Sequence, residues 1–201
     1  MFRARLATLG DSFVAGYGDE DPGGQRLGWV SRFARLLDLP AQRLINLASY
    51  GATTQDVVAD QLEAALVNKP PLVGVMVGVN DLLGDYRTER FRVNVASIFG
   101  AVCGADTVVF TATYPEVPRV APLPEPIREV VRRRFVEANG LLRRFASDHG
   151  VLCLDIAVAP EWRKADMWSA DGLHPGPKGH QRFAEGMAEL VGRVMSTGGT
   201  W

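Results

Sequence analysis

The stretch PLVGVMVGV, residues 71–79, constrains the fold more than any other part of the chain. It is an almost unbroken apolar run that follows two prolines. A strand with one face in water alternates apolar and polar residues, whereas a strand covered on both faces does not. The run therefore predicts a central strand of a parallel sheet that has helices on both sides.

Segments typical of strands and of helices alternate along the rest of the chain. Further strands are predicted at residues 4–10, 42–48, 106–113 and 151–156, and helices at 28–39, 53–66, 88–103, 127–148 and 176–195. This alternation predicts an α/β fold with a parallel sheet. The length of 201 residues, without a repeat or a linker, predicts one domain over residues 1–201.

The composition argues against several kinds of partner. The net charge of −1 provides no general attraction to nucleic acids or anionic membranes. The arginines at 132–134 lie on a predicted helix with Glu129 and Glu137 at pairing distances, which is typical of a solvated face. No apolar run approaches the ~20 residues that span a bilayer, and the N-terminus lacks the pattern of a signal peptide. We therefore expect a cytoplasmic protein without integral membrane association.

Polar residues cluster after the predicted strands. Gly10-Asp11-Ser12 follows the first strand, NLASYGATT (46–54) the second and GVND (78–81) the third, and DGLHP (171–175) precedes the last helix. Ligands of open α/β sheets bind at the carboxyl ends of the strands. We therefore expect these four clusters to converge at one edge of the sheet.

The clusters contain the groups that acyl transfer requires. Ser12 offers a hydroxyl nucleophile, His174 a general base, and Asp171, three residues earlier, a carboxylate that can orient the base. The developing oxyanion needs hydrogen-bond donors. The backbone N–H groups of Ser12 and Gly51 and the side-chain amide of Asn80 are the candidates, because glycine allows close backbone approach and the amide is uncharged.

These four motifs, in this order and spanning residues 10–175, resemble the SGNH (GDSL) hydrolase family, which is named for its Ser, Gly, Asn and His. The resemblance implies a flavodoxin-like three-layer α/β/α sandwich with a five-stranded parallel sheet. It implies ester hydrolysis through an acyl-serine, with Ser12, Asp171 and His174 as the triad. Ser12, Gly51 and Asn80 would form the oxyanion hole, and a small-molecule ester would be the substrate. No metal or cofactor is required.

The chain departs from the family pattern at three positions. Phe13 follows Ser12 where the family often has Leu or Ile, and we expect it to pack under the turn. Tyr50 precedes Gly51 where a small residue is usual, and Ala48 stands where a further glycine is common. Tyr50 either narrows the pocket or points away from it.

The size of the substrate depends on these departures and on two further features. Trp168 is a second candidate pocket residue, with core or rim packing as the alternative for it. The proline-rich segment 114–126 is either a rim of the binding site or an inert surface loop. Tyr50 and this rim together predict a restricted site for short or small acyl groups.

Other polar residues have simpler interpretations. We expect Asp11 to lock the turn, Asp81 to brace the loop that carries Asn80, and His180 to serve in packing or to support the site indirectly. His149 ends a predicted helix, where its charge favours the helix dipole.

Other functions remain as alternatives. Thioester hydrolysis and acyl transfer use the same residues, and the sequence does not separate them. A metal-dependent phosphoesterase would need several closely spaced ligands, and the chain has only three histidines. A non-catalytic nucleotide-binding module would suit the glycine-rich turn, but neither GxGxxG nor GxxxxGK[ST] occurs.

Overall fold

The computed structural model describes residues 5–104, 106–117 and 123–197. Within these residues, five strands form one parallel sheet in the order β2-β1-β3-β4-β5. The strands are β1 (Leu6–Gly10), β2 (Leu44–Asn46), β3 (Leu72–Met76), β4 (Val108–Ala112) and β5 (Leu152–Leu154). Every residue of β1 and β3 is buried, which confirms the strand covered on both faces.

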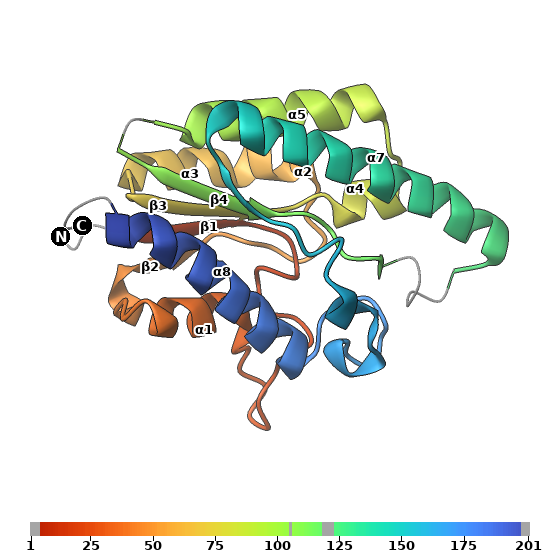
Figure 1. Ribbon diagram of the computed structural model, residues 1–201, viewed down its shortest axis with the longest axis horizontal. Coiled ribbons are helices and arrows are strands. Elements are labelled where there is room, and N and C mark those ends of the chain that lie inside the picture. Colours follow the sequence, from red (N-terminus) through yellow and green to blue (C-terminus); the bar gives the residue numbers. More distant parts are fainter. Residues whose placement is uncertain (1–4, 105, 118–122, 198–201) are drawn as a thin grey trace.

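Helices cover both faces of the sheet (Figure 1). The longer ones are α1 (Gly28–Leu36), α3 (Leu62–Asn68), α5 (Thr88–Val102), α7 (Glu125–His149) and α8 (Pro177–Thr197). The shorter ones are η1 (Ala41–Arg43), α2 (Thr54–Asp56), η2 (Val57–Gln61), α4 (Val79–Leu83), η3 (Pro160–Arg163) and η4 (Ala165–Met167). Helices α1 and α8 pack together on one face, and α3, α5 and α7 lie on the other. This confirms the three-layer sandwich.

The apolar faces of the helices explain this packing. In α8, Phe183, Met187 and Val191 recur every four residues and are fully buried, as expected for one face of a helix. The Trp29 ring of α1 meets Phe183 edge-on at 4.9 Å between ring centroids. This aromatic contact joins the two helices beneath the sheet.

Several boundaries differ from those predicted. The predicted helix 53–66 begins with the expected Thr53 cap but contains the π-helical turn η2. The predicted strand 42–48 is shorter, because η1 occupies its beginning. The short helices α4, η3 and η4 were not predicted. Of the proline-rich segment, residues 118–122 lie outside the described residues.

The end of β1 is held by a side chain in addition to backbone hydrogen bonds. β2 pairs with β1 only as far as Thr8 and Asn46, so it does not reach Gly10. Gln61, which is 3% exposed, accepts a hydrogen bond from the Gly10 N–H (2.8 Å) and donates one to the Gly10 carbonyl (2.9 Å). Gln61 lies in the π-helical turn η2. The Ser49 N–H, just after β2, also donates to the Gly10 carbonyl (3.2 Å), so Gln61 and Ser49 together hold the end of β1 directly before Asp11 and Ser12.

Asp11 is buried beneath the turn that follows β1, with 4% of its surface exposed. One of its carboxylate oxygens accepts a hydrogen bond from the Phe13 N–H at 3.0 Å, as expected of a residue that locks the turn. Burial raises the pKa of the Asp11 carboxyl to about 7 against the lowering effect of that bond, and the charge of Asp81 adds to the rise. The turn is therefore held by the Asp11 carboxyl, whose ionised form is destabilised by burial.

We predict that Gln61→Leu lowers the free energy of unfolding by about 1–3 kcal/mol, because the buried Gly10 N–H loses its acceptor. Chemical denaturation would measure the change. Asn68→Ala is the matched control, since Asn68 donates to the Ala64 carbonyl at an exposed position of α3. Equal stabilities for the two variants would contradict the role of Gln61.

Asp11 also predicts a pH dependence of stability. Between pH 3.8 and about 7 the folded chain retains a proton that the unfolded chain releases. The free energy of unfolding therefore falls as the pH rises, by up to about 4 kcal/mol for a pKa shift of this size. Asp11→Asn is neutral at every pH and retains an oxygen for the Phe13 N–H. Denaturation curves from pH 4 to 8 should show a flatter profile for the variant, and parallel profiles would refute the prediction.

Candidate active site

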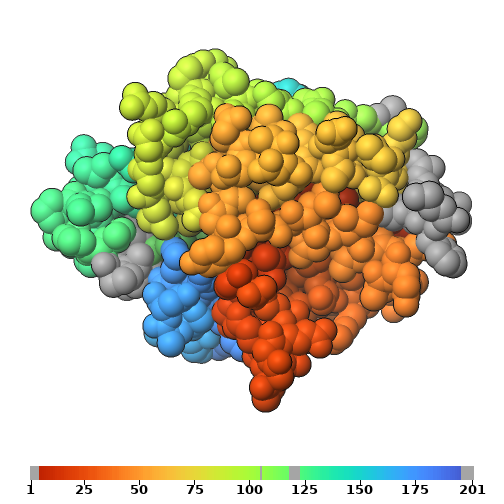
Figure 2. All heavy atoms as spheres, turned by 180° about the vertical axis from the view of Figure 1, so that it is seen from behind, coloured from red at the N-terminus to blue at the C-terminus, as the bar shows by residue number. Residues whose placement is uncertain are grey.

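The four polar clusters meet at the carboxyl edge of the sheet. In Figure 2, the red segment after β1 lies between the light blue segment before α8 and the orange segment after β2. Two residues of these segments, Ser12 and His174, are 162 positions apart in the chain and share a hydrogen bond. The structure therefore brings together the clusters that the sequence analysis expected to converge.

A continuous chain of hydrogen bonds joins Asp171, His174 and Ser12. His174 Nδ1 lies 2.6 Å from Asp171 Oδ2, and His174 Nε2 lies 2.8 Å from Ser12 Oγ. Ser12 and His174 are 8% and 7% exposed. An ionised carboxylate can only accept, so we assign the imidazole proton to Nδ1. Nε2 is then free to accept the Ser12 hydroxyl proton.

Asp171 is held in its ionised form by its neighbours. Its Oδ1 accepts hydrogen bonds from Ser169 Oγ (2.7 Å) and from the N–H groups of Leu173 (2.8 Å) and His174 (2.9 Å). Burial by itself raises the pKa of this carboxyl, but the bonds from His174, Leu173 and Ser169 outweigh it and hold the pKa well below its usual range. The carboxylate therefore stays charged and keeps the imidazole oriented.

Asn80 and Gly51 lie next to one another through a shared loop. Asn80 Nδ2 donates to the Ala52 carbonyl at 2.9 Å, which leaves a second N–H on the same nitrogen. Gly51 has a φ of +75°, a conformation that suits glycine. In the described part of the chain, the backbone N–H groups of Ser12 and Gly51 donate to no protein acceptor. Asn80 and Ser12 line the same cavity.

A buried polar network fastens this loop to α4. Asp81 accepts hydrogen bonds from the Thr54 N–H (2.8 Å) and hydroxyl (2.7 Å), and Asn94 Nδ2 donates to the same hydroxyl (3.0 Å). Asn80 lies in α4 and not in the expected loop, and Asp81 of the same helix connects α4 to Thr54 of α2. Burial raises the pKa of the Asp81 carboxyl against the lowering effect of the Thr54 bonds. Sequence reasoning missed Asn94 and Gln61, because nothing in their local patterns marks them as polar contacts of the site.

His180 and Phe13 support the turn from below. His180 is fully buried, accepts the Trp29 N–H at Nδ1 (3.1 Å) and donates from Nε2 to the Tyr17 carbonyl (2.9 Å). Burial lowers the pKa of its imidazole. Phe13 stacks on the His180 ring at 5.3 Å and meets Phe183 edge-on, so it packs under the turn as expected. His149 hydrogen-bonds the Phe145 carbonyl at the end of α7, far along the chain from these residues.

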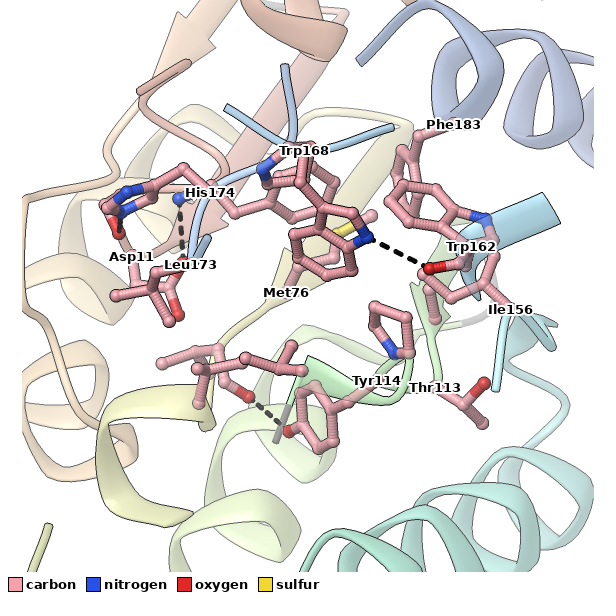
Figure 3. A pocket seen from close by; sticks show the side chains of 18 of the residues that line it. Asp11, Met76, Thr113, Tyr114, Ile156, Trp162, Trp168, Leu173, His174 and Phe183 are labelled. Carbon is pink, nitrogen blue, oxygen red and sulfur yellow. Dashed lines mark hydrogen bonds between the residues drawn. The ribbon is translucent and has the colours of Figure 1, made fainter. Parts of the chain in front are cut away.

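An apolar cavity opens beside Ser12 and His174 (Figure 3). Its walls include Met76, Ile156, Trp162, Trp168, Leu173 and Phe183. Trp168 is 9% exposed and donates from Nε1 to the Trp162 carbonyl at 3.0 Å, which fixes its ring against the cavity. The space inside for water-sized groups amounts to about 60 Å³.

A second hollow lies on the other side of His174. Its lining comes from the turn after β1, from Tyr50 and from the segment before α8: Tyr17, Gly18, Glu20, Tyr50, Ser169, Ala170, Asp171 and His174. Tyr50 is 65% exposed, so its ring does not narrow the apolar cavity. Trp168 and Tyr50, the two candidate pocket residues, therefore belong to different hollows.

Among the described residues, no group of three or more His, Cys, Asp or Glu side chains is arranged to hold a metal ion. Of the helices in the described part of the chain, none combines the length and apolar character that crossing a membrane requires.

Comparison with curated proteins finds a GDSL-like esterase. GDSL-like esterase Rv1075c of Mycobacterium tuberculosis is 25% identical over 195 residues, which cover 92% of this chain and 60% of that protein. The chain therefore spans less than two thirds of the length of this relative.

Solved structures share the fold over nearly the whole chain. The lipase/acylhydrolase from Enterococcus faecalis is 25% identical with a TM-score of 0.73, covering 94% of this chain and 96% of its own. Axe2, an acetylxylan esterase from Geobacillus stearothermophilus, is 19% identical with a TM-score of 0.71, covering 93% of each chain.

The GDSL-like lipase/acylhydrolase family matches residues 8–182, which include all four polar clusters. A match over this much of the chain, together with the fold and the site, decides the family. This protein belongs to the GDSL-like lipase/acylhydrolase family of hydrolases.

Proposed function

We propose that the protein is a serine-dependent carboxylic ester hydrolase that acts through an acyl-serine intermediate. One observation carries the proposal: the hydrogen-bond chain from Asp171 through His174 to Ser12. It contains a nucleophile, a base in reach of it and a carboxylate that orients the base. The family match supports ester hydrolysis as the reaction class.

Acylation follows from the geometry. His174 Nε2 takes the hydroxyl proton as Ser12 Oγ attacks the ester carbonyl, and Asp171 stabilises the imidazolium that forms. The carbonyl oxygen becomes an oxyanion that the Ser12 N–H, the Gly51 N–H and the free N–H of Asn80 stabilise. The tetrahedral species collapses when His174 returns the proton to the leaving alcohol.

Deacylation repeats these steps with water. His174 takes a proton from the water as it attacks the acyl-serine carbonyl, and the same donors stabilise the second oxyanion. Collapse releases the acid and restores the Ser12 hydroxyl with the proton from His174. No step requires a metal or a cofactor.

The apolar cavity supports a short acyl group as the substrate. At ~10–15 Å³ for each water-sized group, its space of about 60 Å³ holds roughly four to six such groups. Its walls are mainly apolar, with Trp162 and Trp168 buried at 4% and 9% exposure. This space suits a short acyl chain.

We predict that Ser12→Ala lowers kcat by at least ~10³, on the scale of triad deletions. Hydrolysis of p-nitrophenyl butyrate in EDTA would measure it, with circular dichroism to verify folding. Ser97→Ala is the matched control, since Ser97 is an exposed serine of α5 that bonds the Val93 carbonyl. Retained activity in a folded Ser12→Ala variant would exclude the serine mechanism.

The cavity also predicts the dependence on acyl length. Among p-nitrophenyl esters from acetate to palmitate, kcat/KM should be highest near butyrate and hexanoate, because each methylene that fits contributes about 0.8 kcal/mol of burial. Longer chains should lose activity, and the Ser12→Ala variant corrects for hydrolysis outside the site. A steady rise toward palmitate would disprove the short-acyl assignment.

A further inference from the structure

We propose that the hollow lined by Tyr17 and Tyr50 binds the alcohol portion of the ester, and that this portion is a neutral sugar ring. The inference rests on the proposed function and names the class of its leaving group. Four features carry it: the position of His174, the exposed aromatic ring of Tyr50, the charges of the lining and the size of the hollow.

The proton that His174 returns to the leaving alcohol indicates where this alcohol must lie. His174 Nε2 must return its proton to the alcohol oxygen, so that oxygen has to lie next to the imidazole. His174 lines both hollows, whereas Ser12 and Asn80 line only the apolar cavity. An acyl group in the apolar cavity therefore directs the alcohol toward the hollow that contains Tyr50.

Two tyrosine rings, tilted by 48° against each other, form a platform in this hollow. The rings of Tyr17 and Tyr50 lie 4.8 Å apart between centroids, and their distances to the His174 ring are 5.8 and 6.2 Å. The Arg26 guanidinium lies 3.7 Å from the centre of the Tyr17 ring and holds it in place. Tyr50 is 65% exposed, and its π face carries partial negative charge that suits the C–H face of a sugar ring.

The charges of the lining suit a neutral alcohol better than an anionic one. Two of the described residues that line the hollow, Glu20 and Asp171, are carboxylates, and none of them is Lys or Arg. Arg26, just outside, lies 3.7 Å from Glu20 and over Tyr17. The phosphates of a carrier such as coenzyme A would lie beside the Glu20 and Asp171 carboxylates, and the nearby Arg26 is already paired with Glu20, whereas sugar hydroxyls can donate to the Glu20 carboxylate.

The dimensions of the hollow agree with a ring-sized group. It is open to solvent and contains about 490 Å³ of space, within the range of small-molecule sites. The apolar cavity has only about 60 Å³. The wider and more polar hollow therefore suits the larger and more polar half of the ester.

Three acetyl donors with different leaving groups test the proposal: a monoacetylated methyl glucoside, ethyl acetate and acetyl-coenzyme A. kcat/KM would be measured for the unaltered protein, Tyr50→Ala and Tyr50→Phe. Val67→Ala is the control, since Val67 is a 75% exposed residue of α3. The unaltered protein should prefer the glucoside ester. Tyr50→Ala should lower the ratio of kcat/KM for the glucoside ester to that for ethyl acetate by about fivefold to tenfold, the size of one aromatic contact.

Tyr50→Phe keeps the ring. The ratio of kcat/KM for the glucoside ester to that for ethyl acetate should therefore stay within about twofold of its value in the unaltered protein, by the same estimate of the aromatic contact. An unchanged ratio in Tyr50→Ala, or acetyl-coenzyme A as the best donor, would overturn the sugar assignment. Hydrolysis of p-nitrophenyl butyrate without preference for the glucoside ester would refute this inference alone. Failure to hydrolyse any of the esters would refute the proposed function, and this inference with it.

Discussion

The site depends on how β1 ends. Its last residue, Gly10, has a φ of +155°, and a side chain at this position would lie 2.1 Å from the Met76 carbonyl oxygen. The chain can therefore turn out of the sheet here only with glycine. Gln61 then hydrogen-bonds both backbone polar groups of Gly10, and the Ser49 N–H also donates to the Gly10 carbonyl. Ser12 follows two residues later, so its position is determined by a rigid sheet and not by a free loop.

The two carboxyls near the turn, Asp11 and Asp171, have different environments. Asp171 receives three hydrogen bonds at one oxygen in addition to His174 Nδ1 at the other, and its pKa is held low. Asp11 receives one from Phe13, and burial raises its pKa to about 7. Asp11 is 4% exposed, whereas the Asp171 side chain is 49% exposed, so burial and the number of donors together decide which carboxyl is charged. Only Asp171 lies in contact with the His174 ring, where a fixed negative charge is useful.

Two hollows flank the His174 imidazole, one of them apolar and the other more polar. The cavity with Trp162 and Trp168 is small and apolar, and the hollow with Tyr50 is wider and contains two carboxylates. An ester has an apolar half and, in many cases, a polar half. The arrangement would therefore orient such a substrate before the chemical step, which reduces the entropy that the reaction must supply.

Local patterns were enough to predict the alternation of strands and longer helices along the chain, because the apolar run at β3 and the periodicity of α8 depend only on neighbouring residues. The sequence also identified Ser12, Asp171 and His174 as candidates, because their motifs are short. The hydrogen bonds by which Gln61 and Asn94 support the site are visible only in the folded chain, since their partners lie 51 and 40 residues away. The tertiary structure also separated Trp168 from Tyr50 into different hollows. Contacts between distant segments depend on how the layers pack, and no local pattern encodes that packing.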